Sequence, residues 1–388
     1  MNQITILHVF KDDKFFDLTK PFFDSIKCVK NNYVYYTKKK NYKFRYIKDT
    51  EDIEIISDFK EYIKLLSSSD IDVIYFQSLP VYYYKFFKYI DSKKKIIWWC
   101  WGYDIYDSFS FYHPIIPVKL YTPLTHRYLK CSVSKCITKF IKKLLLAFLH
   151  PCFLYRRKIA IKRIDYFSPV LEIEYDMMKK EVPYFHATPF MIKGGPGILE
   201  EELFYDIQPC GDILIGNSLT ATNNHFDIID LLKYCSLQST QKLIFPISYG
   251  VESKQYLMAL KEECSTLPIS KIWMESFLPR NEYYEILSNI SFAIFGVLRQ
   301  QAMGNIYLCL ARGVKVFLFK DSIPFKYLSK LGYIVFSIDD DLVGTALQIP
   351  LTKEQVIHNN SLYNRLNHER VREAQIEFDE LVRLICIE

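Results

Sequence analysis

The sequence predicts an α/β protein made of two doubly wound domains, each with a parallel sheet between helices. Its 388 residues exceed one ordinary core and suit two domains of roughly 150 to 200 residues. Short apolar segments alternate with helical patterns in both halves, which is typical of repeated β-α units. A glycine-rich break, MIKGGPG, separates the halves. We expect domains at 1–194 and 195–350, and a helical tail at 351–388 that packs back on the first domain.

In the first half, strands are expected where β-branched and aromatic residues run together between polar turns. They are Ile4–Phe10, NNYVYYT, YKFRYIK, IDVIYFQSL, the apolar part of KKKIIWWCWGYD, and DYFSPVL. Apolar residues at helical spacing predict the helices Phe16–Lys27, Phe59–Leu66 and Glu172–Lys180. Pro80 stands where proline favours the first turn of a helix, ahead of the aromatic run VYYYKFFKYI.

The second half repeats the alternation. Its expected strands are DILIGNS, QKLIFPIS, KIWMES, SFAIFGV, VKVFLF and YIVFSID. Its expected helices are His225–Cys235, Tyr256–Cys264, Glu282–Leu287, Asn305–Arg312, Phe325–Lys330 and a long polar helix from Lys353. Two such sheets, facing each other, would leave a cleft at the carboxyl ends of their strands, where ligands of this architecture bind.

Composition and charge narrow the class of protein. With 50% hydrophobic and 24% charged residues, the chain can bury a large core and is not disordered. Its ten cysteines form no CxxC pair, which favours reduced thiols in a cytosolic protein. We expect neither a signal peptide nor a membrane span. Residues 108–164 carry twelve basic side chains and no acidic one, so the rest of the chain sums to −6. That segment favours an anionic partner.

The stretch ILIGNSLTATNNH holds the first candidate site. A strand that ends at Gly216, with a helix starting near Thr222 or Asn223, offers backbone N–H groups and a positive helix end to an anion. Asn217 and Ser218 add side-chain donors, and Gly216 lets a phosphate approach the backbone. The alternative is an ordinary polar turn with an asparagine cap. Neither the dinucleotide nor the P-loop glycine pattern is present.

A second candidate follows the strand SFAIFGV. Arg299 offers a fork of donors that suits a diphosphate, and the amides of Gln300 and Gln301 can donate to sugar hydroxyls or to carbonyls. Gly304 and Asn305 open the next helix. The alternative is a solvated turn.

A third candidate is WWCWGYDIYD, with Trp101, Gly102 and Asp104. Asp104 can serve as a general base for a hydroxyl, or it can cap a helix or a turn, which is the more common role of such an aspartate. His8, in the first expected strand, is a second candidate base.

These motifs, in this order, resemble the bacterial TDP-Fuc4NAc:lipid II Fuc4NAc transferases, often labelled 4-α-L-fucosyltransferase, glycosyltransferase family 56. The resemblance rests on WGYD, ILIGNS with TNNH, FPISY and RQQAMGN, and is strongest from about residue 210 to 320. It implies a GT-B fold. It also implies that the matching residues hold a TDP-linked deoxy-amino sugar. They are Gly216, Asn217, Ser218, Asn223, His225, Tyr249, Arg299, Gln300, Gln301, Gly304 and Asn305.

The resemblance further implies an acceptor that is a saccharide on a polyprenyl diphosphate, and a place in surface polysaccharide assembly. The basic segment is longer than the family leads us to expect. Within it, CITKFIKKLLLAFL sets apolar residues at helical spacing, with Lys135, Lys139 and Lys142 on another face. This pattern favours a helix in the plane of an anionic membrane, through residues 119–163. A core-facing helix with a basic outer side, or an RNA-binding patch, remains the alternative.

The sequence as a whole predicts a peripheral glycosyltransferase at the cytoplasmic face of the bacterial inner membrane. We expect no cofactor, no metal and no nucleic-acid partner. Asp70-Ile71-Asp72 matches a DxD string, but it stands where it caps a strand. The alternatives are a transferase for another nucleotide-sugar in capsule or O-antigen synthesis, an epimerase of the same architecture, and a non-enzymatic membrane or nucleic-acid binder.

Overall fold

The chain folds into two compact units. In the computed structural model, residues 3–11, 13–106, 114–131, 151–190, 211–250, 254–276, 278 and 280–387 are described. Unit 1 comprises Met1–Pro117, Ile137–Ile198 and His368–Glu388, and unit 2 comprises Val118–Cys136 and Leu199–Asn367. The amphipathic segment expected around Lys139 and Lys142 lies outside the described residues.

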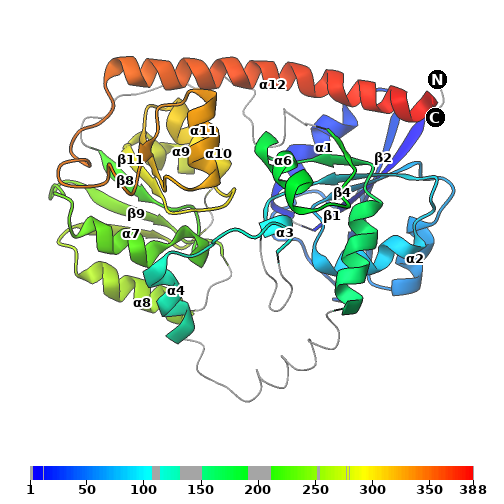
Figure 1. The fold of residues 1–388 in the computed structure, drawn as a ribbon, viewed down its shortest axis with the longest axis horizontal. Coiled ribbons are helices and arrows are strands. Elements are labelled where there is room, and N and C mark those ends of the chain that lie inside the picture. The colour runs from blue at the N-terminus through cyan, green and yellow to red at the C-terminus, as the bar shows by residue number, and fades with distance from the viewer. Residues whose placement is uncertain are drawn as a thin grey trace. The chain divides into compact units, whose positions relative to one another are not determined.

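Unit 1 contains a seven-stranded parallel sheet of order β3-β2-β1-β4-β5-β6-β7 (Figure 1). Its strands are β1 (Ile4–Phe10), β2 (Val29–Tyr36), β3 (Ile53–Ile56), β4 (Val73–Gln77), β5 (Lys95–Trp99), β6 (Tyr166–Ser168) and β7 (Thr188–Pro189). Strand order reverses between β1 and β4, so the loops after these two strands diverge at a topological switch point.

The helices of unit 1 cover both faces of this sheet. They are η1 (Asp13–Phe15), α1 (Phe16–Asp24), α2 (Phe59–Leu66), η2 (Val81–Tyr89), α3 (Tyr103–Tyr106), α6 (Glu172–Glu181) and a helix at 151–162. Helix α2 begins where Asp58 accepts from the backbone N–H groups of Lys60 and Glu61, at 2.8 and 2.9 Å. The helix predicted after Pro80 is present as the 3-10 helix η2.

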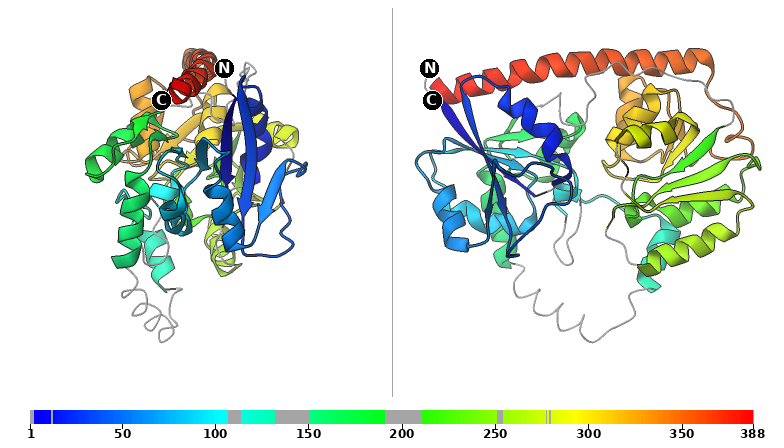
Figure 2. Two further views of the ribbon diagram at one scale, coloured as in Figure 1. Left: turned by 90° about the vertical axis from the view of Figure 1, so that its right-hand side faces the viewer. Right: turned by 180° about the vertical axis from the view of Figure 1, so that it is seen from behind.

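Unit 2 repeats the plan with a six-stranded parallel sheet of order β10-β9-β8-β11-β12-β13. Its strands are β8 (Asp212–Ile215), β9 (Lys242–Pro246), β10 (Ser270–Met274), β11 (Ile290–Phe295), β12 (Lys315–Leu318) and β13 (Phe336–Ser337). Its helices are α4 (Pro123–Cys131), η3 (Ala221–Asn223), α7 (His225–Leu232), α8 (Lys254–Ser265), α9 (Arg280–Ser288), α10 (Met303–Ala311) and α11 (Ile323–Leu331). Figures 1 and 2 show α7 and α8 on one face of the sheet and α9, α10 and α11 on the other.

One predicted strand is wrong, and two short strands escaped prediction. Residues 42–48 form no strand, although exposed and half-buried residues alternate along them. The alternation is real because Tyr42 and Phe44 pack against the ring of Tyr35, with centroids 4.7 and 5.0 Å apart. The neighbour of β2 in the sheet is instead β3, whose four residues are too short to give a period. The strand β7 has only two residues.

Unit 2 includes a piece of chain from the first half of the sequence. The side chain of Asn224 accepts from the N–H of Thr122 at 2.8 Å. The carboxylate of Asp227 accepts from the N–H groups of Leu124 and Thr125, at 2.9 and 2.8 Å, and so caps the start of α4. These bonds join residues more than 100 positions apart in the sequence.

The C-terminal helix α12 (Lys353–Ile387) completes the core of unit 1. Phe378 is fully buried there, and its ring lies 5.6 Å from that of Phe23 and 5.7 Å from that of Phe190. Leu381 and Val382 join the same cluster, together with Ile4 and Ile6 of β1.

His8 lies at the centre of this core as a neutral imidazole. Its ring stacks on Tyr33 at 4.8 Å, and its Nε2 lies 2.8 Å from Oδ1 of Asn31. The Asn31 amide donates to the carbonyl of Phe23, so its oxygen accepts from His8, and the imidazole carries its proton on Nε2. Burial lowers the pKa of His8 from 6.5 to about 4, against the opposing effects of Asn31 and Asp24.

We predict that Phe378→Ala lowers the free energy of unfolding by about 3 to 5 kcal/mol, because it leaves a cavity in a packed aromatic core. Ile376→Ala, on the same helix at 57% exposure, should cost far less. Chemical denaturation of both variants measures the difference. Equal losses would mean that α12 does not build the core of unit 1.

We predict that His8 makes the free energy of unfolding decrease at acid pH. Its folded pKa lies below the unfolded value, so the unfolded state takes up the proton first, and stability falls as the pH drops from about 6.5 toward 4. Between pH 7 and 5, the wild type should lose about 2 kcal/mol more than His8→Gln. Unfolding free energies at both pH values measure this, since other titrating groups are common to the two proteins. Parallel pH profiles would contradict the prediction.

Candidate active site

The switch point of unit 2 brings together the two loops that the sequence predicts to bind a ligand. Strands β8 and β11 are parallel neighbours, so the GNS turn after β8 and the loop after β11 leave the same edge of the sheet. The N–H of Gly216 donates to the carbonyl of Ile294 at 2.9 Å, which carries the pairing to the end of β8.

The GNS turn has a fixed shape because Asn223 organises it from inside. Gly216 has φ +66, and a Cβ there would lie 2.8 Å from Oδ1 of Asn223, so the turn requires glycine. Asn223 is 1% exposed and accepts from the N–H of Asn217 at 3.2 Å. Its amide donates to the carbonyls of Ser218 and Thr220, at 3.0 and 3.1 Å. Asn223 is thus a structural part of the turn.

A chain of polar side chains then joins three loops at this edge. The Asn217 amide donates to the hydroxyl of Tyr249 at 2.8 Å, and its Oδ1 accepts from Nε2 of Gln301 at 3.2 Å. Oε1 of Gln301 in turn accepts from the hydroxyl of Thr222 at 2.7 Å. Three residues predicted from separate motifs, Asn217, Tyr249 and Gln301, therefore belong to one hydrogen-bonded group. Thr222 is a member that the sequence did not single out.

Arg299 and Gln300 lie just beneath the surface beside this group. They are 8% and 7% exposed, and Nη1 of Arg299 donates to the carbonyl of Gln300 at 2.8 Å. The side-chain oxygen of Gln300 is buried and has no hydrogen-bond partner within the described residues. A buried guanidinium next to a free amide acceptor can bind a charged and hydroxylated ligand.

Helix α10, which follows this loop, has an open amino end. Ala302 precedes it in the left-handed region, at φ 62, and caps it with no side-chain hydrogen bond. Its first turn contains no acidic residue. Gly304 is exposed, and an added Cβ would meet no atom within 4 Å. Asn305, next in the turn, is half-buried. By contrast, backbone N–H groups of the GNS turn already have acceptors: Gly216 donates to the carbonyl of Ile294, Asn217 to the side chain of Asn223, and Leu219 to the carbonyl of Tyr249.

His225 is buried next to the GNS turn, and its imidazole is neutral. It is 1% exposed, and its Nδ1 lies 3.0 Å from the hydroxyl of Tyr256. Burial lowers its pKa from 6.5 to about 4, against a hydrogen bond with the backbone of Ser218. The same bond ties the first residue of α7 to the GNS turn.

Asn224 is a second residue that the sequence did not single out. It is fully buried at φ 53, and its amide donates to the carbonyl of Gly296, at the end of β11, at 2.6 Å. A Cβ at Gly296 would lie 2.3 Å from the carbonyl oxygen of Asn223, so these two backbones touch. The only signal in the sequence was a pair of asparagines, which also suits a plain cap.

Asp104 in unit 1 is engaged on both carboxylate oxygens. Oδ2 accepts from the N–H of Leu79 at 3.0 Å and from Nε1 of Trp98 at 2.8 Å. Oδ1 accepts from the N–H of Trp101 at 3.0 Å and lies 3.3 Å from Sγ of Cys100. Burial raises its pKa, and these hydrogen bonds oppose the rise. Through these contacts the carboxylate joins the loops after β4 and β5.

The other motif residues of unit 1 also have structural surroundings. Gly102 turns the chain at φ 79, and Trp101 lies against Phe15, with ring centroids 4.7 Å apart. Asp72 accepts from the N–H of Thr5 at 2.9 Å, at the amino end of the sheet and away from the switch point. Over the described part of the chain, no group of three or more His, Cys, Asp and Glu side chains is placed to hold a metal ion.

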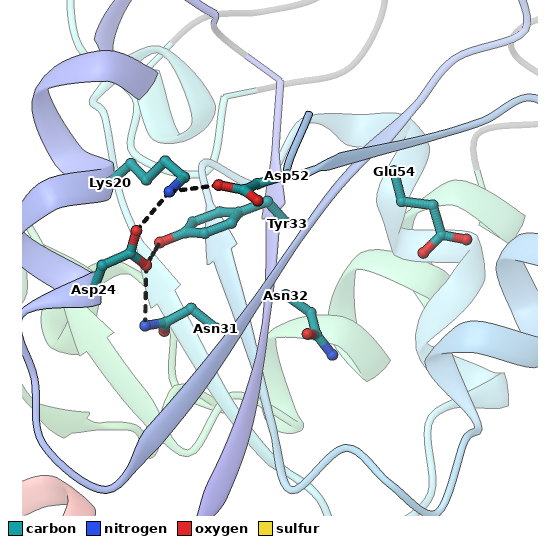
Figure 3. Close-up of a pocket in the computed structure, with 7 residues that line it drawn as sticks. All are labelled: Lys20, Asp24, Asn31, Asn32, Tyr33, Asp52 and Glu54. Carbon is teal, nitrogen blue, oxygen red and sulfur yellow. Dashed lines mark hydrogen bonds and ion pairs between the residues drawn. The ribbon is translucent and has the colours of Figure 1, made fainter. Parts of the chain in front are cut away.

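A hollow of about 520 Å³ opens elsewhere in unit 1, near the amino ends of β2 and β3 (Figure 3). Lys20 bridges Asp24 and Asp52 there, at 2.6 and 2.8 Å, and the hydroxyl of Tyr33 donates to Asp24 at 2.8 Å. Its wall holds three carboxylates and one lysine, so it repels anions. We assign it no part in binding a phosphate-containing substrate.

Solved structures share this fold. An α,α-trehalose-phosphate synthase (UDP-forming) from Burkholderia vietnamiensis aligns over 99% of this chain and 100% of its own, with a TM-score of 0.59 and 9% identity. A sucrose-phosphate synthase from Thermosynechococcus elongatus aligns over 99% of both chains, with a TM-score of 0.55 and 9% identity. A lipopolysaccharide outer core galactosyltransferase aligns over 96% of this chain and 99% of its own, with a TM-score of 0.54 and 9% identity. The fold is therefore that of GT-B glycosyltransferases.

No curated protein matches the chain in sequence. A family model does: that of the 4-alpha-L-fucosyltransferases, glycosyl transferase group 56, matches residues 153–363, more than half of the chain. The matched range spans both candidate loops of unit 2 and confirms the resemblance seen in the motifs. The chain belongs to the 4-alpha-L-fucosyltransferase family, glycosyltransferase group 56, and is a glycosyltransferase.

Proposed function

We propose that this glycosyltransferase moves a deoxy-amino sugar from a TDP donor onto a saccharide linked to a polyprenyl diphosphate, in surface polysaccharide assembly. The observation that carries the proposal is the hydrogen bond between Gln301 and Asn217, with Arg299 buried beside it. It joins the two loops of the switch point, where ligands of doubly wound sheets bind. Three unit 2 residues that match the Fuc4NAc transferase motifs, Asn217, Tyr249 and Gln301, are hydrogen-bonded there.

In this proposal the donor's diphosphate lies at the amino end of α10. That helix end is uncapped by side chains, has no acidic residue in its first turn and leaves open space at Gly304. Helix N-termini of this kind favour anions. Arg299 adds a full positive charge from the preceding loop. The sugar would then contact the polar chain of Asn217, Tyr249 and Gln301, whose amides and hydroxyls match sugar hydroxyls in chemistry.

The reaction breaks the bond between the sugar's anomeric carbon and the diphosphate oxygen. The acceptor hydroxyl oxygen bonds to that carbon and releases its proton to water, and the nucleoside diphosphate leaves with an added negative charge. Arg299 and the α10 end stabilise this charge, which removes the need for a metal ion. Asp104 and His8 have their polar atoms engaged inside unit 1, so we assign no base among them.

A lipid-linked acceptor places the enzyme at a membrane surface, and the described helix at 151–162 supports such a location. Its Tyr155 is 68% exposed, and Arg156, Lys158 and Lys162 are exposed near it. An exposed aromatic ring among cations suits the headgroup region of an anionic bilayer. No helix in the described ranges is both long and apolar enough to span a membrane. On the strength of the exposed ring and cations of the helix at 151–162, we propose peripheral attachment at the cytoplasmic face of the inner membrane.

A transferase for another nucleotide-sugar in capsule or O-antigen synthesis is the second candidate. The fold shared with a lipopolysaccharide galactosyltransferase and with a UDP-forming synthase supports it. The two candidates differ in the nucleotide that the site prefers.

We predict that dTDP stabilises the protein by roughly 2.7 kcal/mol at 100 times its dissociation constant, and that Arg299→Ala removes most of this effect. Transfer should fall about 100- to 1,000-fold in that variant, because the leaving diphosphate loses its cation. Thermal unfolding against dTDP, UDP, GDP and CMP measures the first effect. Arg365→Ala, an exposed arginine of α12, is the control.

The nucleotide that stabilises the protein distinguishes the two candidate functions. Stabilisation by UDP or GDP instead of dTDP would keep the transferase and change the sugar. If no nucleotide stabilised the protein, the proposal for the switch-point site would fail. Arg299→Lys, which keeps the charge, should retain part of the dTDP shift and so excludes simple misfolding.

We also predict that charge reversal of Arg156, Lys158 and Lys162 to Glu releases the protein from vesicles that contain phosphatidylglycerol. Each cation near the headgroups contributes about 1 kcal/mol, so three reversals should abolish binding at physiological salt. Sedimentation with vesicles measures it, and an unchanged dTDP shift shows that unit 2 is intact. Reversal of Lys326, an exposed lysine of unit 2, should have little effect. Undiminished sedimentation of the triple variant would exclude this helix from the membrane contact.

A further inference from the structure

Unit 1 has its own switch point, and Lys11 occupies it. Lys11 follows directly on β1, whose neighbours β2 and β4 lead away in opposite directions. Its ammonium lies 4.4 Å from the centroid of the Tyr35 ring and 5.7 Å from that of Tyr82. Tyr82 is 39% exposed, so this position reaches the surface.

Lys11 is a half-buried cation that gains no hydrogen bond or ion pair from the described residues. Burial lowers its pKa, and the neighbouring charge of Lys39 lowers it further, while Asp13 opposes them. The carboxylate of Asp13 is already held by the N–H of Arg45 at 2.8 Å. Contact with two ring faces offsets part of the desolvation cost. A bound anion would offset the rest.

Further cations lead outward from Lys11 over unit 1. Lys39 and Lys38 are exposed in the loop after β2, where the hydroxyl of Thr37 accepts from the N–H of Lys39 at 3.2 Å. Lys85 comes next, and after burial the charges of Lys38 and Arg156 lower its pKa. We call these five residues, Lys11, Lys38, Lys39, Lys85 and Arg156, the basic surface.

The basic surface extends from the proposed membrane contact to the carboxyl edge of the unit 1 sheet. One end is Arg156, on the helix that we propose to contact the membrane. The other end is Lys11, at the carboxyl edge of the sheet, where the loops that follow β1 and β4 part. Exposed aromatic rings accompany it, since Tyr155, Tyr82 and Phe59 are 68%, 39% and 37% exposed. Cations interleaved with aromatic rings suit a ligand that is both anionic and amphipathic.

We propose that Lys11 binds the diphosphate of the lipid-linked acceptor, and that the basic surface leads this diphosphate from the membrane to the carboxyl end of β1. The proposal rests on the proposed function, because it takes the acceptor to be a polyprenyl diphosphate. It differs in location and chemistry from the nucleotide site, which lies in unit 2. The acidic hollow at the other end of β2 would repel the same ligand.

The test is direct binding of farnesyl diphosphate to the full chain, with the nucleotide site saturated by dTDP. Lys11→Met should weaken binding at least tenfold, because a charge-assisted contact to phosphate is lost. Lys11→Arg should fall between the variant and the wild type. Lys30→Met is the matched control, since it removes the same charge from an exposed lysine near the amino end of β2. Equal affinities for Lys11→Met and Lys30→Met would overturn the proposal.

Two further measurements distinguish binding of the acceptor diphosphate from binding of lipid headgroups, and the Lys11 site from the proposed donor site. Lys11→Met should bind phosphatidylglycerol vesicles as well as Lys30→Met does. A specific loss of vesicle binding would assign Lys11 to lipid headgroups and overturn its role in the acceptor site. The dTDP shift should be unchanged in Lys11→Met. A wild type that binds farnesyl diphosphate but shows no nucleotide shift would refute the proposed donor and leave the Lys11 site standing.

Discussion

The parallel pairing of β8 with β11 decides where this protein can do chemistry. Because both strands end at one edge, two loops that are about 80 residues apart in sequence begin side by side, and the Asn217–Gln301 bond at 3.2 Å follows from that register. The backbone contact of Gly296 with Asn223 leaves no room for a side chain between the loops. The proposed donor site depends on this closeness, because its hydrogen-bonded group takes Asn217 from one loop and Gln301 from the other.

Asparagine does in this site what glycine does in many nucleotide-binding turns. The chain has only 12 glycines, and only Gly216 turns the backbone inside the GNS motif. Asn223 supplies the internal hydrogen bonds of the turn, and Asn224 takes a left-handed conformation while it bonds both Gly296 and Thr122. A turn held by side-chain amides is less mobile than one built from glycine, because its backbone donors are committed. This is why we place the diphosphate at α10 and the sugar near Asn217.

Most of the fold could be predicted from the sequence because strands and helices alternate with distinct periods. Ile4–Phe10 and Phe59–Leu66 have the bounds that the pattern indicates. Residues 42–48 show the limit of this reasoning, since an alternating pattern reports burial and not hydrogen bonding. The motifs of the candidate site could be predicted from the sequence, but the hydrogen bonds that join them could not. No local pattern reveals that Asp227 caps α4 or that Asp104 has both its oxygens engaged, because their partners depend on tertiary structure.

The two ends of the strands in unit 1 differ in charge, and this difference bears on how unit 1 would be oriented at an anionic membrane. The hollow with Asp24, Asp52 and Glu54 lies toward the amino ends of β2 and β3, whereas Lys11 and Lys39 follow the carboxyl ends of β1 and β2. An anionic membrane would attract one end of the sheet and repel the other, so the proposed attachment would give unit 1 a preferred orientation before any specific contact forms. In the proposed attachment, the end that faces the membrane would be the end where doubly wound sheets bind ligands. A lipid-linked acceptor could then reach the carboxyl edge of the unit 1 sheet while its lipid stays in the bilayer. A soluble acceptor would not need this orientation.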